Sequence, residues 1–356
     1  MTVTREAVLE TLKKIQNPVT GTDLVASDVV RALNVEDGKV RFVLEVDQSH
    51  GPAMEPVRQQ AVAELEKLAG AGNVSAVLTA HAQQKAPPDL KIGRHPTQQK
   101  GPQKLPGVKS VLAIASGKGG VGKSTVSANL AVALVAEGKK VGLLDADVYG
   151  PSQPRMLGVS GRPASPDGKT ILPLRNHGVT LMSIGLMTRE DEAVVWRGPM
   201  LMGALQQMLG QVQWGNLDVL IVDLPPGTGD VQMTLAQKTE VAGALIVSTP
   251  QDVALLDARK AVNMFEKLKT NIVGMIENMS TYICPNCGHE AHIFGHGGAR
   301  ADAERMGVPF LGEIPLDLDI RLAADGGAPI VVSKPDNPQT KTFRAIARRL
   351  IDDGVI

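Results

Sequence analysis

The chain has 356 residues, a length that predicts two domains with sizeable cores. Lys plus Arg and Asp plus Glu number 37 each, so the formal net charge is zero, and 3% of the residues are aromatic. Without an excess of basic charge or many stacking rings, the composition argues against nucleic acid or an anionic membrane as a partner. No apolar stretch is long enough to span a bilayer, and residues 1–10 carry no signal-peptide pattern, so we expect a cytoplasmic protein.

The first part of the chain predicts a small α+β domain. Val8, Leu12 and Ile15 recur at helical spacing, and residues 40–46 then alternate between apolar and charged side chains as in a half-buried strand. Helical spacing returns between positions 57 and 68, followed by a second alternating stretch at 74–78. We therefore place this domain at residues 1–81.

A compositional change separates this domain from the rest. Residues 82–107 are rich in Pro and Gln among lysines, with no apolar period. Such a composition is typical of an extended, flexible linker.

Residues 108–356 predict an α/β domain. Short apolar runs alternate with helical patterns, which indicates a mostly parallel sheet covered by helices on both faces. In such sheets, ligands bind at the carboxyl ends of the strands. The runs are 111–115, 141–144, 179–184, 219–222, 244–247 and 272–276.

A phosphate-binding loop follows the first of these runs. Its glycines let successive N–H groups point at phosphate oxygens, and the helix that begins near Ser124 adds its positive N-terminal end. We expect Lys123 to reach the β- and γ-phosphates of the nucleotide and Ser124 to bind Mg²⁺. The nucleotide-binding residues are predicted to be Gly117, Lys118, Gly119, Gly120, Val121, Gly122, Lys123, Ser124 and Thr125.

Lys118 is a second lysine inside this loop, beyond what the basic motif requires. It could be a solvated loop residue, or it could cross a dimer interface to the partner's nucleotide as an arginine finger does in trans. Spacing alone does not choose between the two.

Acidic residues end two further strands. Asp223 follows the run 219–222, where a carboxylate would hold Mg²⁺ through water, and the loop 224–230 after it could sense the γ-phosphate. Asp145 and Asp147 follow the run 141–144. One of the two could orient the attacking water, or both could cap a helix or lie in the outer coordination sphere of Mg²⁺.

The predicted base is adenine. The sequence has no Asn-Lys-x-Asp run for reading guanine, and Asn278 ends the strand 272–277. An Asn amide can bond the N6 and N7 edge of adenine, although an isolated Asn is often a turn residue.

Two cysteines, Cys284 and Cys287, lie in a loop after that strand. In a reducing cytosol a C-x-x-C pair is typical of a metal or redox site. His289, His292 or His296 could complete a zinc site with them. The pair could instead be a dithiol switch, or two chains could form a four-thiolate site for a [4Fe–4S] cluster or zinc. The residues alone slightly favour zinc.

Taken together, the motifs resemble a known family. The loop with its extra Lys118 is similar to the deviant Walker A of the dimeric nucleotidases that include MinD, ParA and the nitrogenase iron protein. The whole set resembles the Mrp/ApbC iron–sulfur cluster carrier ATPases, and residues 1–81 look like the Fe–S assembly P-domain that precedes many of them. The other motifs are Asp-Ala-Asp-Val-Tyr-Gly-Pro-Ser at 145–152, Trp-Arg-Gly-Pro-Met at 196–200, Asp-Leu-Pro-Pro-Gly-Thr-Gly-Asp at 223–230, Glu-Asn-Met at 277–279 and Cys-Pro-Asn-Cys at 284–287.

The resemblance implies roles for these residues. Lys118 would contact the phosphates of the partner subunit, Asp147 would activate the attacking water and Asn278 would contact adenine. Cys284 and Cys287 would bind a [4Fe–4S] cluster shared across a homodimer, with zinc as a substitute in aerobically purified protein.

The expected activity is therefore slow ATP hydrolysis coupled to cluster transfer, with a cluster-assembly scaffold and apo iron–sulfur proteins as partners. The main alternative is a MinD/ParA-type positioning or partition ATPase with a structural zinc knuckle. An electron-transfer reductase and a zinc-stapled scaffold are further alternatives.

Two departures from the family pattern concern the first domain. Ala53 stands where a Pro-Gly-Cys-Pro-like turn often has its cysteine, and residues 17–19 read Asn-Pro-Val where Asp-Pro-Glu is often found. Both count against a direct role of this domain in cluster handling, and leave docking of a partner or an evolutionary remnant as alternatives.

Overall fold

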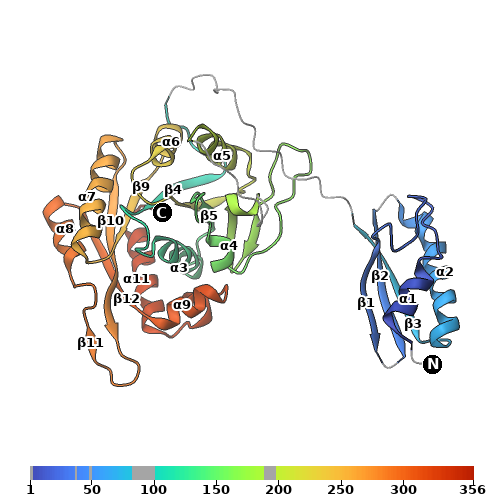
Figure 1. Cartoon of the computed structure of the whole chain (residues 1–356). Coiled ribbons are helices and arrows are strands. Elements are labelled where there is room, and N and C mark those ends of the chain that lie inside the picture. The colour runs from blue at the N-terminus through green and yellow to red at the C-terminus, as the bar shows by residue number, and fades with distance from the viewer. Residues whose placement is uncertain (1–2, 37, 48–49, 82–100, 188–197) are drawn as a thin grey trace. The chain divides into compact units, whose positions relative to one another are not determined.

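The computed structural model describes residues 3–36, 38–47, 50–81, 101–187 and 198–356. The chain divides into two compact units, Met1–Gln84 and Lys85–Ile356 (Figure 1). Each unit has a hydrophobic core of its own.

The first unit is the predicted α+β fold. Its sheet has the order β1 (Val30–Glu36), β2 (Lys39–Asp47) and β3 (Val74–His81), with β1 antiparallel and β3 parallel to β2. Helices α1 (Arg5–Leu12) and α2 (Gly51–Ala69) contribute buried residues to the core. Strand β1 was not predicted, because a bulge around Ala32, which has a φ of 48°, interrupts its alternation.

The predicted linker, residues 82–107, lies mostly outside the described residues. Its last part, 101–107, belongs to the second unit and packs against the rest of it. The N–H of Gln103 donates to Lys238 O at 3.0 Å, Gln103 O accepts from Glu240 N, and Leu105 packs against the core.

The second unit is built on a mixed sheet in which the parallel strands have the order β12-β10-β9-β4-β8-β5-β7. All six predicted strands are present. The parallel strands are β4 (Val108–Ala115), β5 (Val141–Asp145), β7 (Val179–Ser183), β8 (Leu217–Asp223), β9 (Gly243–Ser248), β10 (Ile272–Ile283) and β12 (Phe310–Leu316). Strands β6 (Leu174–Asn176) and β11 (Glu290–Ala291) pair antiparallel with β7 and β10.

Helices cover both faces of this sheet, as predicted (Figure 1). One face carries α5 (Gly198–Gln211), α6 (Asp230–Lys238), α7 (Asp252–Lys267) and α8 (Gly298–Met306). The other carries α3 (Lys123–Ala136), α4 (Gln153–Met156), α9 (Leu318–Asp325), α10 (Ile330–Ser333) and α11 (Pro338–Asp352). A short 3₁₀ helix, η2 (Ile184–Leu186), follows β7. Among the described residues, no helix combines the length and apolarity that crossing a bilayer requires.

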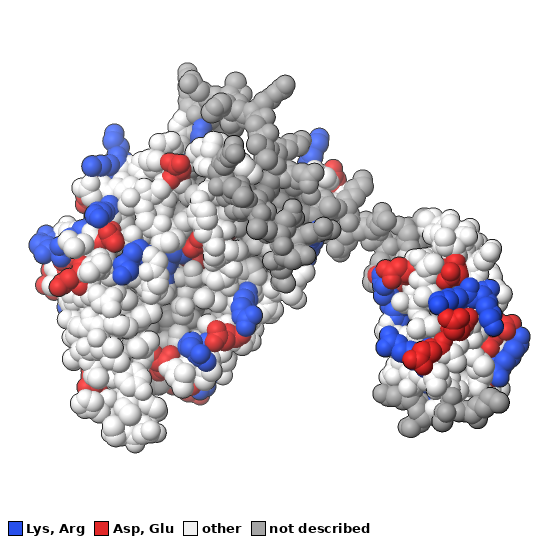
Figure 2. Space-filling view, in the orientation of Figure 1, with Lys and Arg blue, Asp and Glu red and all other residues white. Residues whose placement is uncertain are grey.

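The surface is mixed in charge. On the face drawn in Figure 2, basic and acidic side chains are interspersed over the second unit, and uncharged side chains cover most of the area. The hairpin formed by β10 and β11 extends away from the sheet of the second unit in Figure 1. In Figure 2, which has the same orientation, the surface of this hairpin carries almost no charged side chains.

Strand register brings the predicted acids together. In the β5–β8 pair Asp145 lies opposite Asp223, and in the β4–β8 pair Ile114 lies opposite Asp223. The carboxyl ends of these three strands therefore meet where β4 leads into the phosphate-binding loop.

Candidate active site and cysteine hairpin

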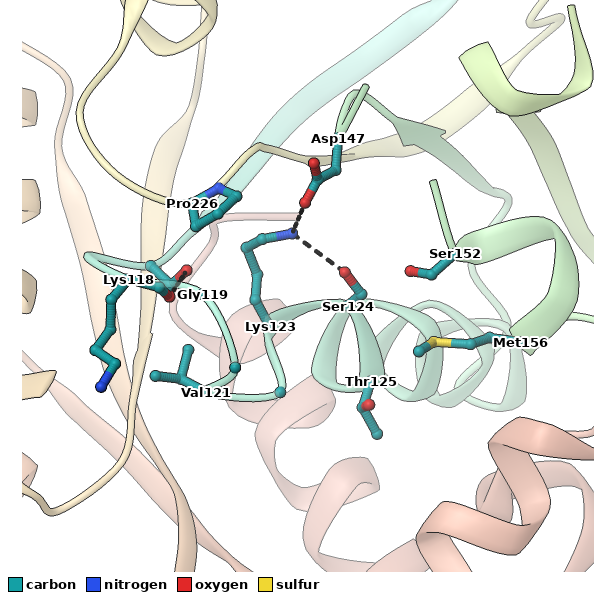
Figure 3. Close-up of a pocket in the computed structure, with 13 residues that line it drawn as sticks. Lys118, Gly119, Val121, Lys123, Ser124, Thr125, Asp147, Ser152, Met156 and Pro226 are labelled. Atoms are coloured by element: carbon teal, nitrogen blue, oxygen red, sulfur yellow. Dashed lines mark hydrogen bonds and ion pairs between the residues drawn. The ribbon is translucent and has the colours of Figure 1, made fainter. Parts of the chain in front are cut away.

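The phosphate-binding loop connects β4 to α3 around a cavity of about 220 Å³ (Figure 3). Gly120 and Gly122 have φ angles of 82° and 80°, in the left-handed region that glycine adopts without strain. A Cβ on Gly117 would lie 2.0 Å from the carbonyl carbon of Asp257, so the loop packs directly on the start of α7. The predicted residues 117–125 all belong to this loop and the first turn of α3, and eight of them line the cavity: Lys118, Gly119, Gly120, Val121, Gly122, Lys123, Ser124 and Thr125.

Lys123 is buried at the base of this cavity. Its Nζ lies 2.6 Å from Asp223 Oδ1, 3.2 Å from Ser124 Oγ and 3.9 Å from Asp147 Oδ2. The ammonium group is thus held at the start of α3 by acids of two other strands, beside the hydroxyl that is predicted to bind Mg²⁺ (Figure 3).

Asp223 lies beneath the cavity rather than on its wall. Besides Lys123, its carboxylate accepts from Ser127 Oγ at 2.8 Å and from Gln153 Nε2 at 2.8 Å. Gln153 Nε2 also donates to Ser124 O at 2.9 Å, so one buried amide joins α4, α3 and β8. Gln153 was not predicted as a site residue, and the one sequence signal for it is its position directly after the motif at 145–152.

The structure places the two acids at the end of β5 in different surroundings. Asp145 is fully buried, and its Oδ2 accepts from Ser152 N, Gln153 N and Ser183 Oγ at 3.0 to 3.1 Å. Burial, and next the negative charge of Asp223, raise the pKa of Asp145 to about 7. Asp145 therefore anchors the turn that carries the next acid.

Asp147, by contrast, lines the cavity. Its Oδ1 is shielded from solvent and has no hydrogen-bond partner among the described residues. Burial raises the pKa of Asp147, while the nearby Lys123 ammonium opposes that shift. A carboxylate on the wall of this cavity, with Oδ2 directed at Lys123, can take a hydrogen bond from a water molecule bound there.

Lys118 is oriented differently from Lys123. In Figure 3 its side chain points away from Lys123 and Ser124. Within the described part of the chain, its ammonium group makes no ion pair within 4.0 Å. Pro226, from the predicted γ-phosphate sensor, lines the same cavity.

The sensor loop is closed by a side chain that the sequence reading did not single out. Gln232 Nε2 donates to Pro225 O at 2.8 Å and to Gly227 O at 3.0 Å, and Gln232 Oε1 accepts from Gly229 N. Gly227 N in turn donates to Ser116 O at 2.8 Å, which ties this loop to the end of β4.

Asn278, the predicted adenine contact, is buried beside the loop. Its Nδ2 donates to Val121 O at 2.8 Å, and a Cβ on Gly122 would lie 2.1 Å from the same nitrogen. The residue after it, Met279, has a φ of 57°, and the pairing of β10 with β12 shifts register beyond this point.

The two cysteines lie at the turn of the β10–β11 hairpin. Cys284 N donates to His289 O, and Gly288 N donates to Cys284 O, both at 2.9 Å. Cys284 is half-buried and Cys287 is exposed. Backbone N–H groups of Cys287 and Asn286 that face the Cys284 sulfur lower the pKa of that thiol.

The predicted intrachain zinc alternative is not assembled in the described residues. No group of three ligands within 4.8 Å of one another joins the cysteines to His289, His292 or His296. His296 lies with Glu277 and Glu313 instead.

A strand, a glycine loop, a buried lysine and acids at the neighbouring strand ends together define a P-loop ATPase. Residues 107–351 match the ParA family described as NUBPL iron-transfer P-loop NTPase, and residues 5–76 match the iron–sulfur cluster assembly protein family. The iron–sulfur cluster carrier protein of Escherichia coli strain K12 is 43% identical over 350 residues, covering 97% of this chain and 91% of that protein. The chain belongs to this family of iron–sulfur cluster carrier NTPases.

Solved structures agree with this assignment. A nucleotide-binding protein from Archaeoglobus fulgidus in complex with ADP is 40% identical, with a TM-score of 0.57, over 66% of this chain and 92% of that one. The cell division ATPase MinD of Pyrococcus furiosus is 25% identical, with a TM-score of 0.52, over 68% and 99%. The predicted fold and family are thus confirmed, and the family match favours the carrier interpretation over the partition ATPase.

The Trp196–Arg197 part of the predicted motifs lies outside the described residues.

Proposed function

We propose that this chain is a homodimeric ATPase that holds a labile [4Fe–4S] cluster between its subunits and transfers it to apo-proteins. The observation that carries the proposal is a single strand, β10, which contacts the phosphate-binding loop through Asn278 and leads into the hairpin that bears Cys284 and Cys287. Nucleotide chemistry and metal ligation are therefore linked through one continuous element.

The cavity suits a Mg²⁺-bound nucleotide phosphate. Left-handed glycines shape the loop, the Ser124 hydroxyl lies beside the Lys123 ammonium, and Asp147 Oδ1 has no partner among the described residues. When bound, Mg²⁺ would neutralise charge on the phosphates. Ser124 would hold it directly, with Asp223 and Asp145 acting through water or neighbouring groups.

In this proposal Lys123 stabilises the negative charge of the β- and γ-phosphates, and Asp147 orients the attacking water. Asn278 would contact the adenine edge. Since the Lys118 side chain points away from Lys123 and Ser124, it would reach the phosphates of the partner subunit. Hydrolysis would then require the dimer.

Two thiols per chain provide half of the ligands that a [4Fe–4S] cluster needs. A symmetric dimer supplies four from the same hairpin of each chain. The hairpin suits such a contact, because Ile283 and Ile293 are exposed and Glu290 is the only Asp, Glu, Lys or Arg from 279 to 295. The lowered pKa of Cys284 favours the thiolate that binds iron.

The partners follow from this chemistry. A cluster-assembly scaffold would load the hairpin site, and apo iron–sulfur proteins would accept the cluster, in the cytoplasm. Zinc would be a substitute occupant when the protein is purified in air.

Anaerobic reconstitution with iron and sulfide tests the proposal. We expect about four irons per dimer in the wild type, a matching loss in Cys284→Ser/Cys287→Ser, and transfer of the cluster to an apo-acceptor. His289→Ala serves as the control, because it changes the same hairpin and leaves both thiols intact. Tight zinc that iron does not replace, or iron that persists without both thiols, would contradict the proposal.

A further inference from the structure

Two carboxylates face each other across neighbouring strands in the part of the sheet that leads to the hairpin. In the parallel pairing of β10 with β12, Glu277 lies directly opposite Glu313. Like charges placed directly opposite on adjacent strands destabilise a sheet unless a positive charge compensates them. Neither acid takes part in the nucleotide site or the cysteine hairpin described above.

Glu277 is fully buried and held in a fixed orientation. Its Oε1 accepts from Gly297 N at 2.8 Å and its Oε2 accepts from Ala299 N at 2.7 Å, at the N-terminal end of α8. These two bonds fix the orientation of the carboxylate, and each oxygen keeps a lone pair for a further ligand.

Glu313 presents an oxygen that lacks a partner. The side chain is 39% exposed, yet its Oε2 is shielded from solvent and accepts no hydrogen bond from any described residue. A shielded polar oxygen without a partner is costly unless a donor or a cation satisfies it.

His296 completes a three-ligand group with the two acids. Its Nε2 lies 3.3 Å from Glu313 Oε2, without the geometry of a hydrogen bond, and one ligand atom from each residue falls within 4.8 Å of the other two. Two atoms that each lie about 2.1 Å from a metal are about 3.0 Å apart at an octahedral angle and about 3.4 Å apart at a tetrahedral one. The observed separation of 3.3 Å falls between these values.

The neighbouring positive group does not cancel the two negative charges. Arg300 lies 3.9 Å from Glu313 Oε2 and is half-exposed, with its guanidinium 4.4 Å from the centre of the Phe310 ring. With His296 neutral, the group therefore keeps a net negative charge. The ring of His292 lies 4.7 Å from that of His296, but His292 is not one of the three ligands.

We propose that Glu277, His296 and Glu313 form a binding site for one divalent first-row transition metal ion per chain, such as Zn²⁺, Co²⁺ or Fe²⁺. One imidazole and two carboxylates suit ions of this class. The site is separate from the cysteine pair and does not depend on the carrier function proposed above.

Co²⁺ binding tests the site in full-length, tag-free, metal-stripped Cys284→Ser/Cys287→Ser protein, in which the hairpin thiols cannot contribute. We expect one Co²⁺ per chain, seen by its visible absorption and measured by competition with a chromophoric chelator. His296→Ala and Glu313→Gln should each weaken binding by at least the roughly tenfold that loss of an outer-sphere partner already costs at a metal site. His292→Ala removes the adjacent imidazole and should leave the affinity within about twofold of the parent.

Failure of the parent to bind one equivalent, or full affinity in either ligand variant, would overturn the proposal. An equal loss in His292→Ala would overturn the assignment of His296 as the histidine ligand. His296 is exposed enough for its alanine variant to fold, and nucleotide binding by each variant checks this. When a chelator keeps the protein free of metal, the melting temperature of Glu313→Gln should be no lower than that of the parent, because the change removes a like-charge contact.

Discussion

The amide of Asn278 donates a 2.8 Å hydrogen bond to the main-chain oxygen of Val121, so strand β10 supports the phosphate-binding loop directly. The same amide occupies the space that a side chain on Gly122 would need. Since β10 runs on to Cys284, a displacement of the loop on nucleotide binding has a short covalent path to the cysteine hairpin.

Replacing Gly122 should disturb this contact more than replacing Gly120. Both glycines have left-handed φ angles, so alanine costs about 1 kcal/mol of strain at either position. Only at Gly122 does the new Cβ fall 2.1 Å from Asn278 Nδ2, which adds about 1 kcal/mol for the lost hydrogen bond. Urea unfolding without nucleotide measures the difference by tryptophan fluorescence, because Trp196 and Trp214 both belong to the second unit.

The double variant Gly122→Ala/Asn278→Ala is the internal control. If the two residues interact as described, the double variant loses less stability than the sum of the single variants, by about 1 kcal/mol. Additive losses would show that the close approach of Gly122 to Asn278 carries no energetic weight.

Asp147→Asn should separate nucleotide binding from hydrolysis. The change keeps the size of the side chain and removes the charge that orients water. We therefore expect the rate of ATP hydrolysis to fall by about 100-fold or more, with ATP affinity little changed. Steady-state ADP formation and fluorescent-nucleotide titration measure the two quantities. Asp325→Asn, an exposed acid on α9, is the matched control, and an undiminished rate in Asp147→Asn would refute the catalytic assignment.

Mixing two inactive variants tests whether Lys118 acts across the dimer. Lys118→Ala keeps its own Lys123, and Lys123→Ala keeps a Lys118 that can serve a partner. Each variant alone should be inactive, whereas an equal mixture should recover about a quarter of the wild-type rate, since half of the dimers then hold one complete site. No recovery in a mixture that still forms dimers would mean that Lys118 acts within its own chain or not at all.

Glu137 provides a pH-dependent contribution to stability away from the site. It accepts from Arg344 Nε at 2.7 Å and Arg348 Nε at 2.9 Å, joining the end of α3 to α11. The hydrogen bond from Arg348, followed by that from Arg344, lowers the pKa of Glu137 below its model-peptide value of 4.5. The stabilisation is therefore complete above about pH 4.5 and is lost as the pH falls through the lower folded-state pKa.

We accordingly expect Glu137→Gln to destabilise the second unit by about 1 kcal/mol at pH 7, and this difference should shrink below about pH 4.5 and vanish once the pH has fallen through the lowered folded-state pKa. Urea unfolding as a function of pH measures it. Glu240→Gln is the control: it removes an exposed ion pair in which Glu240 Oε2 lies 3.8 Å from Lys104 Nζ. It should lower the free energy of unfolding by less than about 0.5 kcal/mol at any pH. A pH-independent loss in Glu137→Gln would show that packing, not charge, holds α11 at this point.

Local sequence determined the parts of the protein that are formed by consecutive residues. The apolar runs predicted the central strands because a parallel strand buried on both faces must be apolar throughout. Strand β12 escaped prediction because Gly312 and Pro315 interrupt its apolar pattern and it is only partly buried. The short strands β6 and β11 have too few residues to show any period.

The phosphate-binding loop was equally readable, because one continuous segment supplies the glycines, Lys123 and Ser124. Only the tertiary structure shows that Asp145 is enclosed whereas Asp147 lines the cavity, although the sequence places the two acids almost side by side. The contact of Asn278 with Val121 and the opposition of Glu277 and Glu313 likewise depend on strand order and register. Such relationships join residues far apart along the chain, and packing of the whole sheet, rather than any local pattern, sets their distances.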